Sequence, residues 1–217
     1  MNNASGILLT PGDGQTFRFD AGTLCLEFLL TGSLPQWERL HTPEDLAAWI
    51  PRSRLGLPDR IVVGEADLAG AKRLRAAIQA LAERATGTEG AAEAQGAPAV
   101  DPRGAPAVDP RGAPAVLNEF AAAPPPAPLI TPSFRLGWAT PVTGAQFLSA
   151  VARDAVELFG GPMASRVRVC GGERCLLVFL DTSRPGARRW CSMDRCGNRH
   201  KLRTRRDRAP RSATEEP

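Results

Sequence analysis

Histidine is scarce in this chain, since His41 and His200 are the only two among 217 residues. Neither belongs to a motif that places a nucleophile beside a base, as most hydrolytic and group-transfer sites require. Cys25 could act as a nucleophile, but it stands in an apolar run, where a cysteine usually behaves as a small buried hydrophobe. We therefore expect that the protein is not an enzyme.

Long apolar runs are also missing. No run approaches the roughly 20 residues that a helix needs to cross a bilayer, so we expect no membrane role. The first residues show no charged region followed by a long apolar run and a small-residue cleavage site. Because disulfides belong mainly to secreted proteins, we expect a cytoplasmic protein whose thiols stay reduced.

Charge is distributed unevenly along the chain. Residues 163–217 contain 14 lysines and arginines against 6 acidic residues, a net charge of +8, whereas residues 1–162 contain 13 against 17, a net charge of −4. This division is expected when one module meets a polyanion and the other does not, although a basic tail can also serve solubility alone. The length allows one ordinary core and a small metal-held module, so we expect two units.

Four cysteines form two pairs near the C-terminus, Cys170 with Cys175 and Cys191 with Cys196. Two short loops of this kind can bring four thiolates around one ion, and four intervening residues is the long end of the usual spacing. Bound metal then replaces the large hydrophobic core that so short a segment lacks. The pattern predicts one structural Zn²⁺ per chain. Another metal or a redox pair is the alternative, and His200 could replace one of the cysteines.

The start of the chain combines strand and helix patterns. Residues 17–20 alternate as a strand does, whereas the apolar run over 24–30 fits both period two and a helix, so its conformation stays open. The capping hydroxyl of Thr42, followed by a proline and two acids, predicts a short helix through Ile50. Pro51 should end this helix.

Two longer amphipathic helices are expected further along. Apolar residues at steps of three and four predict a helix over 67–85, the clearest in the chain. Thr143 should cap a second helix, which the glycines and proline at 160–162 terminate. Residues 134–138 can supply a strand between the two.

A proline- and alanine-rich repeat lies between these helices. Residues 96–103 recur unchanged at 104–111 and begin again at 112–116. Prolines at this frequency are incompatible with helix or sheet interiors, and an eight-residue unit is too short for a solenoid. We predict an extended insertion over about 87–116, followed by one or two helical turns over 117–123.

The residues around the cysteines predict the local fold of the metal module. Alternation at Val167 and Val169 and an apolar run over 176–180 predict a hairpin, with the first cysteine pair at its turn. Glycines in this turn would let the backbone curl around the metal. A helix is expected to start near Cys196. The predicted fold class is therefore α+β, with a treble-clef-like finger that ends in a helix.

Several short stretches carry a family resemblance. Cys-Gly-Asn-Arg at 196–199, with Arg-Arg-Trp-Cys-Ser-Met at 188–193 and Phe-Leu-Asp-Thr-Ser at 179–183, closely resembles the bacterial CGNR zinc-finger family. Upstream, residues 24–28 and 74–78, together with Thr-Pro-Glu-Asp-Leu at 42–46, resemble landmarks of the ABATE domain that precedes this finger. The family often has an Asn-Thr pair after the first landmark, whereas this chain has Leu-Thr.

The resemblance implies a domain organisation and a function. It implies an ABATE-like domain over residues 1–162, a CGNR zinc finger over 163–208 and a disordered tail over 209–217. It also implies stress-induced transcription regulation. Together with the separate charge and the amphipathic helices, it suggests that the first domain senses a signal, such as a small-molecule effector, or forms a homodimer.

Cations follow the last cysteine so densely that we expect a DNA-contacting surface there. If a helix starts at Cys196, then Arg199, Arg203 and Arg206 share one face, which could contact phosphates or enter a major groove. We predict a DNA-binding transcription regulator. The alternative is a zinc-held protein-interaction or thiol redox-switch module without sequence-specific DNA binding. The predicted DNA contacts are Arg195, Arg199, Lys201, Arg203, Arg205, Arg206 and Arg208.

Overall fold

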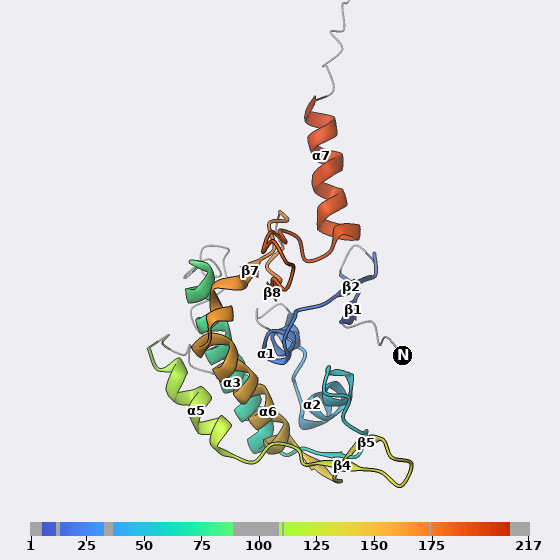
Figure 1. The fold of residues 1–217 in the computed structure, drawn as a ribbon, viewed down its shortest axis with the longest axis vertical. Coiled ribbons are helices and arrows are strands. Elements are labelled where there is room, and N and C mark those ends of the chain that lie inside the picture. The colour runs from blue at the N-terminus through green and yellow to red at the C-terminus, as the bar shows by residue number, and fades with distance from the viewer. Residues whose placement is uncertain are drawn as a thin grey trace, which may run out of the picture.

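The structure is a computed structural model that describes residues 6–11, 14–32, 37–88, 109, 111–173 and 175–208. It has the predicted α+β character, with helices forming most of the body and the strands occurring as short pairs (Figure 1). The α-helices are α1 (Leu24–Phe28), α2 (Pro43–Trp49), α3 (Glu65–Thr86), α5 (Ala113–Ala122), α6 (Gly144–Gly160) and α7 (Asn198–Arg208). The strands are β1 (Ile7–Leu9), β2 (Phe17–Phe19), β3 (Ile61–Val62), β4 (Pro128–Ile130), β5 (Leu136–Trp138), β6 (Val142–Thr143), β7 (Val167–Val169) and β8 (Val178–Leu180).

The strands of the described residues pair two by two. Antiparallel pairing joins β1 to β2, β4 to β5 and β7 to β8, while β3 runs parallel to β6. Within the described part of the chain, none of the helices has the length and apolar character that a bilayer crossing would need.

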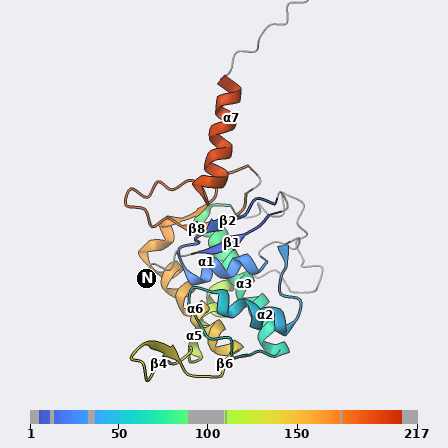
Figure 2. The same ribbon diagram turned by 90° about the vertical axis from the view of Figure 1, so that its right-hand side faces the viewer.

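Helices α3, α5 and α6 pack side by side (Figures 1 and 2). The predicted helix over 67–85 is confirmed as α3, whose buried face includes Leu74 and Ile78. The predicted cap of α6 is also confirmed, because the Thr143 hydroxyl accepts the Gln146 amide and the Gln146 side chain accepts the Thr143 amide. Phe147 of α6 is completely buried, and its burial places α6 at the centre of the core.

The apolar run over 24–30, which fits both strand and helix periods, is helical. Thr23 caps α1 by accepting the Leu26 amide, and a 3₁₀ turn over Leu29–Thr31 follows. All five residues of α1 are buried, so the run carries no polar face that could reveal a period. Cys25 is completely buried, and burial together with nearby Asp154 raises the pKa of its thiol well above the ordinary value.

The helix predicted after Thr42 is present, but its end differs from the prediction. Thr42 and Asp45 form the reciprocal capping box expected of this sequence. The α-helix ends at Trp49, and Pro51 lies inside a 3₁₀ turn over Ile50–Arg52 instead of stopping the helical path. A proline is tolerated there because the first turn of a helix needs no amide donor.

Helix α5 corrects the predicted extent of the insertion. It begins at Ala113, so the prediction of an extended chain through residue 116 is wrong at its end. Pro114 occupies the first turn, and buried Ala113 and Leu117 pack α5 against α3 and α6. Of the repeat before Ala113, the structure describes only residues 109, 111 and 112, and the predicted tail over 209–217 also lies outside the described residues.

The strand predicted over 134–138 is shorter than expected. Phe134 lies in the turn between β4 and β5 with a positive φ of 57°, and β5 begins only at Leu136. The side chains of Phe134 and Leu136 are mostly exposed, so this part of the hairpin contributes little to the core.

One hydrophobic core extends from the N-terminal unit (residues 1–162) into the finger (residues 163–208). The Leu180 amide of β8 donates to the Ala21 carbonyl at 2.8 Å, directly before α1. Gly22 has a positive φ of 89°, and a Cβ atom at this position would lie 2.7 Å from the Leu180 Cβ. The glycine therefore permits both the turn and the close contact between the two units.

A buried carboxylate stabilises the same region through an arginine. Glu27 of α1 is 2% exposed and accepts both the backbone amide of Arg54 at 2.8 Å and its Nε at 3.0 Å. The Arg54 guanidinium also donates to the Gly22 carbonyl and to Asp20, each at 2.8 Å. Burial raises the pKa of Glu27, and the bonds from Arg54 only partly oppose this rise.

We predict that Arg54→Ala lowers the free energy of unfolding by about 2–4 kcal/mol at pH 7, because the buried Glu27 charge loses its partner. Since the folded-state pKa of Glu27 is raised, the folded protein binds the proton more tightly than the unfolded chain does. Because Arg54 lowers this pKa, its removal should raise the pKa further, so the variant gains more stability on protonation and the loss should shrink as the pH falls from 7 towards 5. Urea unfolding at the two pH values measures both effects.

Arg73→Ala is the matched control, because the Arg73–Glu119 ion pair is exposed on both sides. It should cost about 1 kcal/mol or less at either pH. Equal losses in the two variants, or a loss for Arg54→Ala that does not change with pH, would contradict the role assigned to Arg54.

Candidate metal centre

The first cysteine pair lies at the turn of the predicted hairpin. Strands β7 and β8 pair antiparallel, and the Cys170 amide donates to the Leu177 carbonyl at 2.9 Å just beyond them. Strand β8 starts at Val178 and not at residue 176 as predicted. The hairpin thus brings Cys170 and Cys175 to the same end of the finger.

The second pair reaches this hairpin through backbone hydrogen bonds. The Gly171 amide donates to the Arg189 carbonyl at 2.9 Å, and the Cys191 amide donates to the Cys170 Sγ at 3.2 Å. Cys196 lies in a π-helical turn over Met193–Gly197 that leads directly into α7. This order of hairpin, loop and helix is the predicted treble-clef arrangement.

The four sulfurs lie within 4.8 Å of one another, and all four cysteines are free thiols. The Cys175 and Cys191 sulfurs are 3.8 Å apart, and those of Cys191 and Cys196 are 3.5 Å apart. Tetrahedral zinc with four thiolates has sulfur separations of about 3.8 Å. A Cβ atom at Gly172 would lie only 2.7 Å from the Cys196 Sγ, so the sulfurs can gather only around a glycine. The four cysteines fit one structural zinc ion.

Hydrogen bonds among the sulfurs polarise the thiols. Bonds from Cys175 and Cys191 lower the pKa of Cys170 to about 2. The contact with Cys170 raises the pKa of Cys175 to about 12, and contacts with Cys170 and Cys175 raise the pKa of Cys191. Because zinc binds thiolates, the remaining protons must leave when the metal binds, and zinc affinity should fall at low pH.

His200 is not part of the sulfur cluster. Among the described residues, the group that could hold a metal contains only the four cysteines. The His200 ring instead packs against Trp190, with 4.8 Å between the ring centroids and the ring planes tilted by 34°. The suggestion that His200 could replace a cysteine therefore finds no support in the geometry.

Sequence reasoning did not assign roles to Asp181 and Arg188, which shape the loop between the cysteine pairs. Asp181 is completely buried and accepts the Ser183 hydroxyl at 2.6 Å, the Ser183 amide at 3.0 Å and the Arg188 amide at 2.9 Å. These bonds fix the turn that returns the chain to Cys191. Both residues lie in the stretches that carry the family resemblance, so that resemblance was the available signal.

The Arg188 side chain joins the metal centre to the N-terminal unit. Its guanidinium lies 4.1 Å from the centre of the Phe179 ring and donates to the Cys191 carbonyl at 2.7 Å. It also donates to the Asp20 carbonyl at 3.1 Å. One cation therefore holds a metal-site loop and the segment before α1 at the same time.

The predicted DNA contacts lie on and just before α7, which extends away from the body of the molecule (Figures 1 and 2). Arg195 precedes the helix, is half-buried and lies 4.8 Å from the centre of the Phe17 ring. Arg203 forms an ion pair with Glu173. The side chain of Arg208 lies outside the described set. The exposed cations of the helix are Arg199, Lys201, Arg203, Arg205 and Arg206.

Two family models match the sequence. The first is ABATE, described as "Putative stress-induced transcription regulator", over residues 22–162. The chain belongs to the ABATE family. The second match is the CGNR zinc finger over residues 166–209, so the predicted family and the predicted order of its parts are confirmed. No curated protein matches the sequence. Neither description is that of an enzyme.

In this CGNR finger, we predict that Cys191→Ser reduces bound zinc from about one per chain to near zero, because an incomplete shell loses the free energy that folds the module. The melting temperature of the whole ABATE protein should fall as well, since the core is continuous across both units. Metal analysis and thermal unfolding measure the two effects.

His200→Ala serves as the control, and it should retain its zinc. Undiminished zinc in Cys191→Ser, or loss of zinc in His200→Ala, would show that the ligand set is different.

Proposed function

We propose that this protein is a DNA-binding transcription regulator in which zinc holds the finger, the finger presents α7 to DNA, and the N-terminal unit senses a signal. Cys170, Cys175, Cys191 and Cys196 are the proposed zinc ligands. We take residues 1–162 as the sensing domain and residues 163–208 as the finger.

The observation that carries the proposal is the position of α7 outside the core. Its 11 residues contain six cations and one acid, and the helix extends from the body (Figure 2). The five of these cations whose side chains the structure describes are exposed. A helix of this length spans about 16 Å, and the major groove of B-DNA, about 12 Å wide, admits a helix. A protruding, strongly basic helix is suited to contact with a polyanion.

The cations of α7 fall on two sides of the helix. Arg199 and Arg203 lie on one side, where Arg203 pairs with Glu173 of the first cysteine loop. Lys201 and Arg205 are four residues apart on the other side and exposed. We propose that this second side contributes the main phosphate contacts. Arginine can additionally form two hydrogen bonds to guanine, which would add sequence preference.

A thiol redox switch is the second candidate, favoured by the partial exposure of Cys175. The other three cysteines are buried, whereas Cys175 is reachable from solvent. Hydrogen peroxide would oxidise two thiolates to a disulfide and be reduced to water, which would release the metal. Zinc release at low peroxide concentration, reversed by a dithiol reductant, would favour this function.

We predict that the double variant Lys201→Ala, Arg205→Ala weakens binding to duplex DNA and lowers the slope of log affinity against log salt concentration by about 2, because each lost phosphate contact removes about 0.9 from that slope. Zinc content should not change. A titration at several salt concentrations measures the slope, and selection from random duplexes shows whether a preferred sequence exists.

Arg135→Ala is the matched control, since this cation is exposed on the β4–β5 hairpin, at the end of the molecule opposite α7 (Figure 1). It should bind DNA as the unchanged protein does. DNA affinity that is equal in the double variant and the control would rule out α7 as the contact surface.

A further inference from the structure

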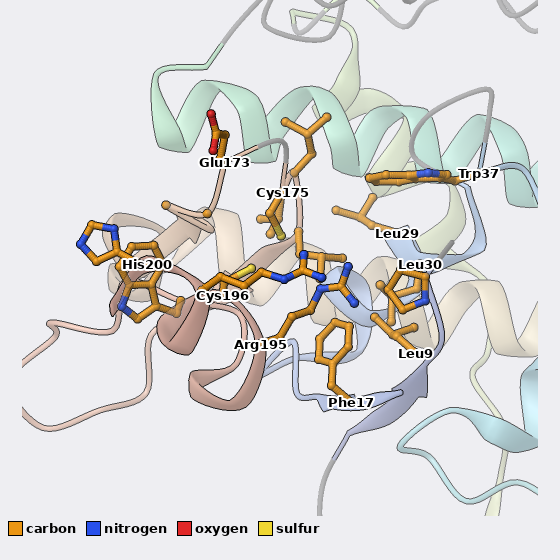
Figure 3. A pocket seen from close by; sticks show the side chains of 18 of the residues that line it. Leu9, Phe17, Leu29, Leu30, Trp37, Glu173, Cys175, Arg195, Cys196 and His200 are labelled. Carbon is orange, nitrogen blue, oxygen red and sulfur yellow. The ribbon is translucent and has the colours of Figure 1, made fainter. Parts of the chain in front are cut away.

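A cavity of about 600 Å³ lies between the N-terminal unit and the finger (Figure 3). The β1–β2 hairpin and the turn after α1 line one side, while the first cysteine loop and the start of α7 line the other. Cavities of about 300–1,000 Å³ accommodate ordinary small-molecule ligands. Its position between two units is also typical of ligand sites.

One side of the cavity is apolar. Leu9 and Phe17 come from the β1–β2 hairpin, and Leu29 and Leu30 come from the turn after α1 (Figure 3). Trp37 adds an aromatic ring that is 41% exposed. An apolar recess that remains open to solvent favours a ligand with an apolar body.

The residues around this recess carry a positive charge. Four arginines line the cavity, and Glu173 is the only acidic residue among the described residues that line it. Their sum is a net charge of +3. In Figure 3 the Arg195 side chain lies over Phe17, in agreement with the 4.8 Å between its guanidinium carbon and the ring centre. The four arginines are Arg39, Arg195, Arg199 and Arg203.

We propose that this cavity binds a small organic anion, a carboxylate on an aromatic or acyl body, with the apolar body against the leucines and the carboxylate among the arginines. Guanidinium groups recognise carboxylates through paired, charge-assisted hydrogen bonds. Apolar and cationic walls that meet in one recess match a ligand with both characters. The site adjoins the zinc centre, because Cys175 and Cys196 also line the cavity, but it differs from the zinc centre in chemistry.

The site also suggests how a signal could reach DNA. A ligand would contact the N-terminal unit on one side and Arg199 and Arg203 of α7 on the other. Its negative charge would offset part of the positive field of the helix. This regulatory step rests on the proposed DNA-binding function, whereas ligand binding itself does not.

Two matched probes test the ligand class on the zinc-loaded full chain: 1-naphthoate, and its uncharged analogue 1-naphthalenemethanol. Titrations follow tryptophan fluorescence, since Trp37 and Trp190 line the cavity, and calorimetry gives the stoichiometry. We expect saturable binding of one naphthoate per chain, with the uncharged analogue binding roughly tenfold more weakly. Absence of saturable naphthoate binding, or equal binding of both probes, would overturn the proposal.

Two variants test the location. Arg39→Gln should weaken naphthoate binding roughly tenfold without affecting the uncharged analogue. Thr10→Trp should abolish binding of both probes, because the added ring fills the recess from its exposed edge. Arg135→Gln, which lies outside the cavity, should bind both normally. Zinc content and melting temperature verify folding, and naphthoate binding that is unchanged in folded Arg39→Gln and Thr10→Trp would place the site elsewhere.

The ligand site and the DNA function can fail independently. The Lys201→Ala, Arg205→Ala variant should bind naphthoate normally even though it binds DNA weakly. Saturating naphthoate should change the DNA affinity of the unchanged protein by threefold or more, an order-of-magnitude expectation for a coupled pair of sites. An unchanged DNA affinity would overturn the regulatory step and leave the ligand site standing.

Discussion

The hydrogen bond from the Leu180 amide to the Ala21 carbonyl joins the finger to the N-terminal unit, and much of the structure depends on this junction. Gly22 allows the segment before α1 and strand β8 to approach each other, and Arg188 adds a hydrogen bond to the Asp20 carbonyl. The side chains on both sides then form one continuous core. Zinc binding therefore stabilises more than the finger, because whatever folds the finger also covers the core of its neighbour.

This junction also places the remaining functional features relative to one another. Because β8 is fixed to the segment before α1, the first cysteine loop faces the β1–β2 hairpin across the cavity. Helix α7 starts at the last cysteine, so its orientation depends on the metal centre. A ligand in the cavity, the zinc ion and the basic helix would thus act on the same few contacts, and a change at one of them can reach the others.

Buried charges in the N-terminal unit are paired, which explains several of the family landmarks. Glu27 bonds to Arg54, and Arg75 of α3 bonds to Glu38, with both members of the second pair less than a tenth exposed. Arg75 also donates to the Thr31 carbonyl at 2.9 Å and to its hydroxyl at 3.2 Å. The threonine of the family's Asn-Thr pair thus keeps a structural partner here. The leucine that replaces the asparagine lines the cavity.

Local signals in the sequence determined the parts of this protein that depend on neighbouring residues. The caps at Thr42 and Thr143, the long α3 helix and the two cysteine pairs follow from spacing alone, because their bonds join residues a few positions apart. The helical state of residues 24–30 was visible only in the tertiary structure. Burial on every side removes the polar face by which a sequence period is recognised. The link from Arg188 to the Asp20 carbonyl and the existence of the cavity were also decided by the tertiary structure. Each brings together residues that lie more than 100 positions apart in the chain. No pattern of spacing encodes such a contact; packing of the two units around a shared core creates it.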